Sequence, residues 1–139
     1  MKAFSFTVKS KSRSQLIDIT SSVRQGIQDA GITDAVCVIY VPHTTAGITI
    51  NECADPDVSA DIIACLDRMV PWRADYRHRE GNAAAHIKAS LMGSSVNVAV
   101  SAGRLMLGTW QGIFFCEFDG PRTRNVNVYA MTGKGLPNA

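Results

Sequence analysis

The sequence predicts a single α+β domain, residues 1–139, dominated by antiparallel strands with two to three helices. Its 139 residues suit one domain with a hydrophobic core. The hydrophobic fraction of 46% and the charged fraction of 19% are ordinary for a globular protein. Short apolar or alternating runs separated by polar residues indicate strands, and three segments carry the start and stop signals of helices.

The first elements are two strands and a helix. Residues 3–8 and 15–19 alternate or cluster apolar side chains, and the polar residues 10–14 between them form the expected turn. Thr20, Ser21 or Ser22 can cap a helix that runs to about Ala30, because Val23, Ile27 and Ala30 share one face and Gly31 is a typical helix stop.

The middle of the chain predicts two strands and the best-marked helix. Residues 35–41 form an apolar run typical of a fully buried strand, and residues 46–51 a second strand. Asp55 is a natural N-cap, Pro56 suits the first helical position and Asp57 favours the positive end of the helix dipole. This helix should end near Val70.

The remaining chain predicts a helix and three strands. Asn82 should cap the helix and Gly93 should end it. Apolar runs then predict strands at 95–100, at 105–117 with a break near Gly108, and at 125–131, before a frayed tail at 132–139.

Charge, apolar runs and cysteine spacing exclude several classes of protein. The net charge of +2, with interspersed signs, predicts no nucleic-acid partner. No apolar run approaches the roughly 20 residues that cross a bilayer, so no membrane partner is expected. The alternating N-terminus reads as a strand and not as a signal peptide. The cysteines lack CxxC spacing, which favours reduced thiols and a cytoplasmic location; they are Cys37, Cys53, Cys65 and Cys116.

The three histidines are the main candidates for chemistry, because imidazole binds transition metals and transfers protons near neutral pH. His43 follows a proline at the end of a predicted buried strand, where side chains often face a cleft. Its alternative is a hydrogen bond to Thr44 or Thr45 within a turn.

His78 and His86 flank a loop and a helix start, and they lack the one-turn spacing of a helical metal motif. Glu80, between them, could be a ligand, an acceptor for an imidazole N–H or a general base. The backbone N–H groups near Asn82 could bind an anion. Helix capping would explain the same residues.

The last polar cluster comprises Trp110 and Gln111, and further on Asp119 and Arg122. Trp110 and Gln111 lie between glycines and could form the rim of a pocket. Alternatively, 119–121 is a plain turn, and the two acids and two arginines of 117–124 form a structural ion-pair network.

Several motifs together resemble the YjbQ-like family, in order and at family-like spacing from about residue 3 to residue 131. They are HTTAGITINE from His43, DPDV from Asp55, YRHREGN from Tyr76, AHIK from Ala85, LGTWQGI from Leu107 and EFDGPR from Glu117.

This resemblance implies a two-sheet β-sandwich, a homotrimer and a polar site in which a divalent metal, with zinc as the candidate, binds. Family members are described as secondary thiamine-phosphate synthases, which join an aminopyrimidine diphosphate to a thiazole phosphate and release pyrophosphate. The matching family positions are the three histidines, Glu80, Trp110, Gln111, Asp119 and Arg122.

We therefore expect an enzyme of phosphorylated small molecules. His43, His78 and His86 would bind the metal. The expected catalytic residues are Glu80, His78 and Lys88, and the expected phosphate-binding residues are Asn82, Lys88, Trp110, Gln111, Asp119 and Arg122. The alternative is a trimeric metal- or phosphometabolite-binding module without efficient catalysis.

Overall fold

A computed structural model describes residues 1–133 as three helices and eight strands. The elements are β1 (Lys2–Lys9), β2 (Gln15–Asp18), α1 (Thr20–Asp29), β3 (Ala35–Tyr40), β4 (Ala46–Glu52), α2 (Pro56–Met69), α3 (Ala83–Met92), β5 (Ser95–Ser101), β6 (Arg104–Leu105), β7 (Gln111–Glu117) and β8 (Thr123–Met131).

The strands form two antiparallel sheets. The larger has five strands in the order β1-β8-β3-β5-β6, and the smaller has three in the order β2-β7-β4. β8 therefore lies between the first and third strands of the chain, with Phe6 opposite Val126 and Ile39 opposite Val128. In the smaller sheet Ile48 lies opposite Phe115. The predicted fold class is confirmed.

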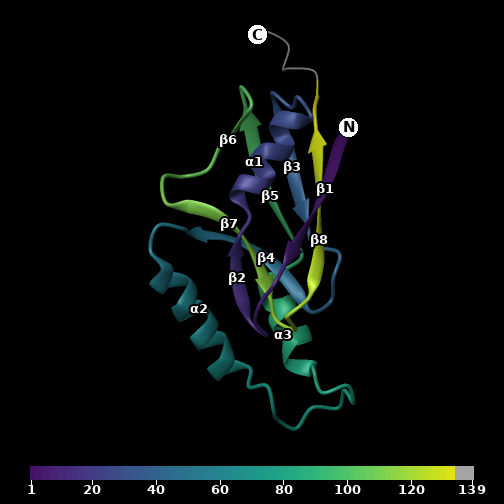
Figure 1. Ribbon diagram of the computed structural model, residues 1–139, viewed down its shortest axis with the longest axis vertical. Helices are drawn as coiled ribbons and strands as arrows, with labels where there is room; N and C mark the ends of the chain where they lie inside the picture. The colour runs from purple at the N-terminus through teal and green to yellow at the C-terminus, as the bar shows by residue number, and fades with distance from the viewer. Residues whose placement is uncertain (134–139) are drawn as a thin grey trace.

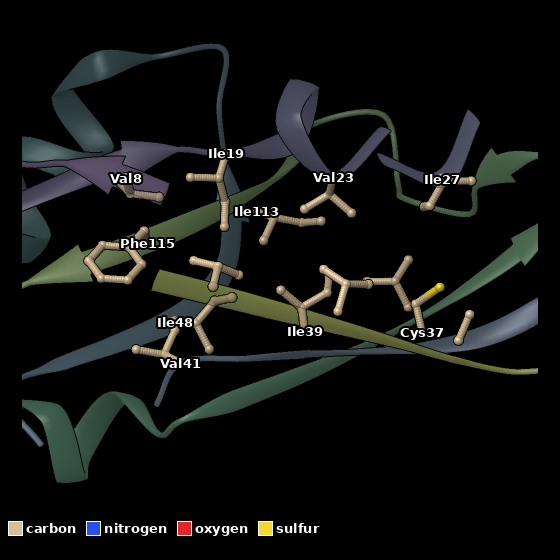
Figure 2. Packing of buried hydrophobic residues seen from close by; sticks show 14 of the residues in the cluster. Val8, Ile19, Val23, Ile27, Cys37, Ile39, Val41, Ile48, Ile113 and Phe115 are labelled. Carbon is tan, nitrogen blue, oxygen red and sulfur yellow. The ribbon is translucent and has the colours of Figure 1, made fainter. Parts of the chain in front are cut away.

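The main core lies between the two sheets and continues beneath α1. Cys37 and Ile39 point inward from the larger sheet, and Ile48 and Phe115 from the smaller one (Figure 2). All four are fully buried. Period-2 alternation explains this, because every second residue of a strand faces the same side. Val23, fully buried on α1, packs on this core together with Ile19 and Ile27 (Figure 2).

A second, smaller cluster covers the other face of the three-stranded sheet. Leu66 of α2 and Ala85 and Ala89 of α3 pack with Cys116 and Phe118. Figure 1 shows α2 and α3 at the lower end of the molecule, where β8 also begins. The layers are therefore sheet, sheet and helices, and the beginning of α3 is placed beside the turn between β7 and β8.

Most predicted elements agree with the structure, and the differences are local. The predicted strand at 105–117 is divided, because β6 ends at Leu105 and β7 begins at Gln111. Ile19 occupies the N-cap of α1 without a side-chain cap bond, and the Asp18 carboxylate accepts the Thr20 N–H instead (2.9 Å). The Asp55 cap is confirmed, since its carboxylate accepts the Asp57 N–H at 2.9 Å.

The structure also bears on the expected membrane spans, cysteines and C-terminal tail. No helix within residues 1–133 is long and apolar enough to cross a membrane. All four cysteines are free thiols. Of the expected frayed tail, residues 134–139 lie outside the described residues.

Gly47 marks a close approach between β4 and the end of α3. A Cβ at this position would lie 2.8 Å from the carbonyl oxygen of Gly93 and 3.1 Å from Cβ of Met92. That carbonyl also accepts the Ile48 N–H at 3.1 Å, so it cannot move away freely. The glycine therefore sets the distance between the helix and the loop that carries His43.

We expect Gly47→Ala to lower the free energy of unfolding by about 1–3 kcal/mol, because the added methyl group forces packed backbone apart. Chemical denaturation measures this. Gly133→Ala is the matched control, since among residues 1–133 no atom beyond its chain neighbours lies within 4 Å of its added Cβ. This variant should stay within about 0.5 kcal/mol of the parent. Equal stability of the two variants would contradict the close approach.

Candidate functional site

A polar hollow of about 510 Å³ lies where β3 ends, α3 begins and the β7–β8 turn crosses between them. Six of its lining residues are sequence-predicted site residues: His43, Glu80, Asn82, His86, Asp119 and Arg122. Tyr40, Pro42, Thr44, Thr45 and Arg124 complete the lining. We call this hollow the histidine pocket. It joins three separate parts of the chain, residues 40–45, 80–86 and 119–124.

Beneath the histidine pocket lies a buried ion pair between Glu117, at the end of β7, and Arg124, in β8. Glu117 is 0% exposed and Arg124 is 4% exposed. The Arg124 Nε donates to Glu117 Oε1 at 2.9 Å, and Nη2 donates to Oε2 at 2.5 Å. Nη2 also donates to Thr45 Oγ1 at 2.9 Å. The sequence alternative of a structural ion-pair network is confirmed for these two residues.

Ser10 connects this ion pair to the turn that carries Arg122. Its hydroxyl donates to Glu117 Oε1 at 2.7 Å and accepts the Arg122 backbone N–H at 2.8 Å. The Arg122 side chain in turn donates from Nε to the Asp119 carbonyl (2.8 Å) and from Nη2 to Asp119 Oδ2 (2.9 Å). The guanidinium at the rim is thus oriented by the turn that bears it.

His43 is held in one tautomer by the backbone of β8. Its Nε2 accepts the Asn125 N–H at 2.9 Å, so Nε2 carries a lone pair and Nδ1 carries the proton of the neutral ring. Burial and the nearby Arg124 charge lower the pKa of His43 below 6.5. The imidazole is therefore neutral at pH 7, with an Nδ1–H available as a donor.

Asn82 links the start of α3 to the β7–β8 turn, and it does not cap the helix with its side chain. Its Nδ2 donates to Asp119 Oδ2 at 3.0 Å. Its Oδ1 is buried and has no hydrogen-bond partner among residues 1–133. Because buried acceptors are nearly always hydrogen-bonded, this amide oxygen is a candidate to accept a hydrogen bond from a ligand.

His78 approaches His86 but lines a different hollow, formed by residues 72–83. The two rings are edge to face, with centroids 5.2 Å apart, and His78 Nε2 lies 3.8 Å from Glu80 Oε2. Within residues 1–133, no three His, Cys, Asp or Glu side chains are grouped as metal ligands. A metal on His43 would also compete with the Asn125 N–H for Nε2, so the three imidazoles do not fit one metal site in this geometry.

The structure separates three predicted phosphate-binding residues from the histidine pocket. Lys88 is 2% exposed and pairs with Asp67 of α2. Trp110 is 62% exposed, and the Gln111 side chain accepts the Gly108 N–H within its own turn. These residues therefore lie outside the pocket that contains His43 and Arg122.

Sequence reasoning missed Ser10 and Tyr40, and it treated Thr45 only as a turn partner of His43. Ser10 lies in a serine-rich turn and carries no motif, so nothing local marked it. Thr45 shares the HTTAG motif with His43, but its role, which is to accept a hydrogen bond from Arg124, depends on a contact 79 positions away.

The chain matches the family model described as "UPF0047 protein YjbQ-like" over residues 4–133. It is 54% identical to UPF0047 protein YugU of Bacillus subtilis over 125 residues, covering 89% of this chain and 95% of that protein. It is 50% identical to UPF0047 protein MJ1081 of Methanocaldococcus jannaschii, covering 90% of this chain and 91% of that protein.

Solved structures agree with these matches. A YjbQ/UPF0047 family protein of Clostridium acetobutylicum superposes with a TM-score of 0.89 at 52% identity, covering 92% of this chain and 99% of that chain. Protein APE1520 of Aeropyrum pernix K1 superposes with a TM-score of 0.91 at 38% identity, covering 96% of this chain and 100% of that chain.

Replacing Glu117 tests the ion pair beneath the pocket. Burial acts to raise the pKa of its carboxyl group, but the hydrogen bonds from Arg124, Ser10 and the Asp119 N–H outweigh burial and hold the pKa below 4.5. Glu117→Gln leaves Arg124 buried without a counter-charge, so we expect a loss of about 3–5 kcal/mol in the free energy of unfolding at pH 7.

The pH dependence follows from the direction of this shift. A carboxyl group with a lowered folded-state pKa stabilises the protein above its unfolded pKa and loses that effect as pH falls through the folded value. The difference in free energy of unfolding between the parent and Glu117→Gln should therefore become smaller as the pH falls below 4.5. Glu80→Gln, which changes a 76% exposed side chain, is the control. A Glu117→Gln protein as stable as this control at pH 7 would contradict the account.

Proposed function

The chain belongs to the YjbQ-like family of UPF0047 proteins, and we propose that it is an enzyme of the secondary thiamine-phosphate synthase type. Its histidine pocket would bind an aminopyrimidine diphosphate and a thiazole phosphate, join them and release pyrophosphate. The observation that carries this proposal is the convergence of six sequence-predicted polar residues on one hollow large enough for a small molecule.

The proposed reaction makes few demands on proton transfer. The bond between the pyrimidine methylene carbon and the diphosphate oxygen breaks, and its electron pair leaves with pyrophosphate. The thiazole nitrogen then gives its lone pair to that carbon, so no proton is exchanged at the new bond. Catalysis requires mainly positioning and stabilisation of the charge on the leaving oxygen.

Two donors of the histidine pocket suit the departing pyrophosphate. The Arg122 guanidinium has five N–H donors, of which two contacts go to Asp119, and its side chain is 52% exposed. The remaining donors can reach a phosphate at the rim. His43 adds the Nδ1–H of a neutral ring, which can donate a hydrogen bond to an oxyanion.

Asn82 and Glu80 offer hydrogen-bond acceptors, which suits them to the pyrimidine amino group and not to the phosphates. The unpartnered Asn82 Oδ1 is an acceptor, which complements an amino or hydroxyl group and not a phosphate oxygen. A small shift of the side chain would let the amino group of a pyrimidine donate to it. Glu80, an exposed residue of the pocket lining, supplies a second acceptor.

Binding of a divalent metal, with zinc as the candidate, stays a prediction that is separate from this mechanism. The proposed steps need only the donors named above. His78 and His86 are the two imidazoles that lie close together, and metal analysis of purified protein tests whether they retain an ion. The cytoplasmic location and the phosphorylated substrate likewise stay predictions.

The alternative proposal is a trimeric module that binds a phosphometabolite or a metal without efficient catalysis. One observation favours it. Arg124 is largely occupied by Glu117 and Thr45, which leaves Arg122 as the main cation for a pyrophosphate. A homotrimer in either case would use the exposed apolar face of the five-stranded sheet, where Val36 lies opposite Met131 and both are about half exposed.

We expect purified protein to form thiamine phosphate from the two proposed substrates, and Arg122→Gln to lower the rate by about a hundredfold or more. His86→Ala should lower it as well. Arg24→Gln is the matched control, because this exposed arginine of α1 lies outside the pocket. Liquid chromatography measures the product, and light scattering of the same sample should give the mass of three chains.

The outcomes separate the two proposals. A rate lowered by Arg122→Gln and His86→Ala, but not by Arg24→Gln, supports the enzyme. A rate equal in all variants indicates a contaminating activity and contradicts it. Saturable binding of the diphosphate substrate without product favours the binding module.

A further inference from the structure

A second polar hollow, of about 380 Å³, lies between the loop 10–14, α2 and α3. Its polar and aromatic lining residues are Ser12, Arg13, Ser14, Asp67, Trp72 and Lys88. No residue of this lining belongs to the histidine pocket. On α3, Lys88 follows His86 by two positions, which turns its side chain about 200° away. The two hollows therefore lie on opposite sides of this helix.

Lys88 supplies a buried cation with donors to spare. Its side chain is 3% exposed, and Nζ donates to Asp67 Oδ1. An ammonium group has three N–H donors, and Asp67 is the single partner of this one within residues 1–133. Buried polar groups normally use their hydrogen-bonding capacity. The remaining donors of Lys88 thus favour a further acceptor in the hollow.

Arg13 supplies a second, pre-oriented cation. Its guanidinium carbon lies 4.2 Å from the centroid of the Trp72 ring, a distance typical of a cation–π contact. No carboxylate within residues 1–133 forms a salt bridge with it. Its position is also fixed through the backbone, because the Arg13 carbonyl accepts the Gly120 N–H at 3.1 Å. The indole ring covers one face of the guanidinium, so its N–H edge stays available.

The charges of the two hollows differ. Arg13 and Lys88 against Asp67 leave one net positive charge in the second hollow. In the histidine pocket, Arg122 and Arg124 are balanced by Asp119 and Glu80, with Glu117 buried beneath. The second hollow thus combines a net positive charge with hydroxyl donors from Ser12 and Ser14, which is the chemistry that recognises a tetrahedral oxyanion.

We propose that this hollow is a second binding site, separate from the histidine pocket, for a phosphate group. Lys88 and Arg13 provide the charge, the two serines provide neutral hydrogen bonds and Trp72 holds Arg13 in place. The phosphate belongs either to a free ion or to a phosphomonoester, and both present the same three or four oxygens to these donors. This site does not depend on the activity proposed for the histidine pocket.

Nuclear magnetic resonance tests the site on the full chain, with inorganic phosphate and glycerol phosphate as separate probes at constant ionic strength. The chain has two tryptophans, and their indole N–H signals report on different places. The Trp72 signal and the backbone amides of residues 12–14 should shift saturably. The Trp110 signal should stay fixed, because Trp110 lines neither hollow.

Variants connect the signal to the proposed donors. Arg13→Gln changes an exposed side chain and should raise the half-saturating concentration about tenfold or more. Lys88→Met should raise the half-saturating concentration by a similar factor. Arg122→Gln should leave that concentration within about twofold of the parent value. A stronger response to glycerol phosphate would identify a phosphomonoester, and an equal or weaker one the free ion.

The proposal is overturned by a Trp72 signal that does not shift with either probe. It is also overturned by equal half-saturation in the parent and Arg13→Gln, or by a loss confined to Arg122→Gln. If Lys88→Met does not fold, Arg13→Gln decides the matter alone, because its exposed side chain is not part of the core.

Discussion

The buried ion pair between Glu117 and Arg124 is the interaction on which the rest of the site depends. Burying either charge alone would cost several kcal/mol. The pair is tolerable because Arg124 donates to both carboxylate oxygens and to Thr45, while Ser10 and the Asp119 N–H satisfy the remaining acceptors. These partners come from different strands and loops, so one polar cluster joins the larger sheet to the smaller one.

The same cluster determines the chemistry of the pocket above it. Arg124 places a positive charge near His43, and together with burial this lowers the pKa of the imidazole. The Asn125 N–H, one residue further along β8, fixes the tautomer. Ser10 holds the turn that carries Arg122. A neutral donor and an oriented guanidinium therefore face the pocket because the ion pair beneath them is satisfied.

Local signals in the sequence were sufficient for most of the fold. Asp55 and Pro56 mark the start of α2 through interactions within three residues, and an apolar run marks β3. The run predicts a fully buried strand, but Val36 and Tyr40 of β3 are exposed, since every second residue of a strand faces away from the core. The convergence of His43 and His86 on one pocket was predicted only through the family resemblance, because their spacing reflects the packing of α3 against β4 and not a local repeat.

Gln111 and Lys88, which were expected in the site, lie outside the histidine pocket for physical reasons. Gln111 and Glu117 begin and end the same strand, so they lie about 20 Å apart at the rise of a β-strand, and both ends cannot reach one pocket. Lys88 was expected to bind phosphate in the same site as His86, with which it shares the AHIK motif. Two positions along a helix, however, point the two side chains in nearly opposite directions. Such outcomes depend on which helix face is buried, which no single segment reveals.

The most direct test of this account is the titration of His43 in isotopically labelled protein, followed through its ring nitrogens by nuclear magnetic resonance. We expect a proton on Nδ1 in the neutral ring, because Nε2 accepts the Asn125 N–H. We also expect a titration midpoint below 6.5, because burial and the nearby Arg124 charge lower the pKa of His43. A proton on Nε2, or a midpoint at or above 6.5, would contradict it.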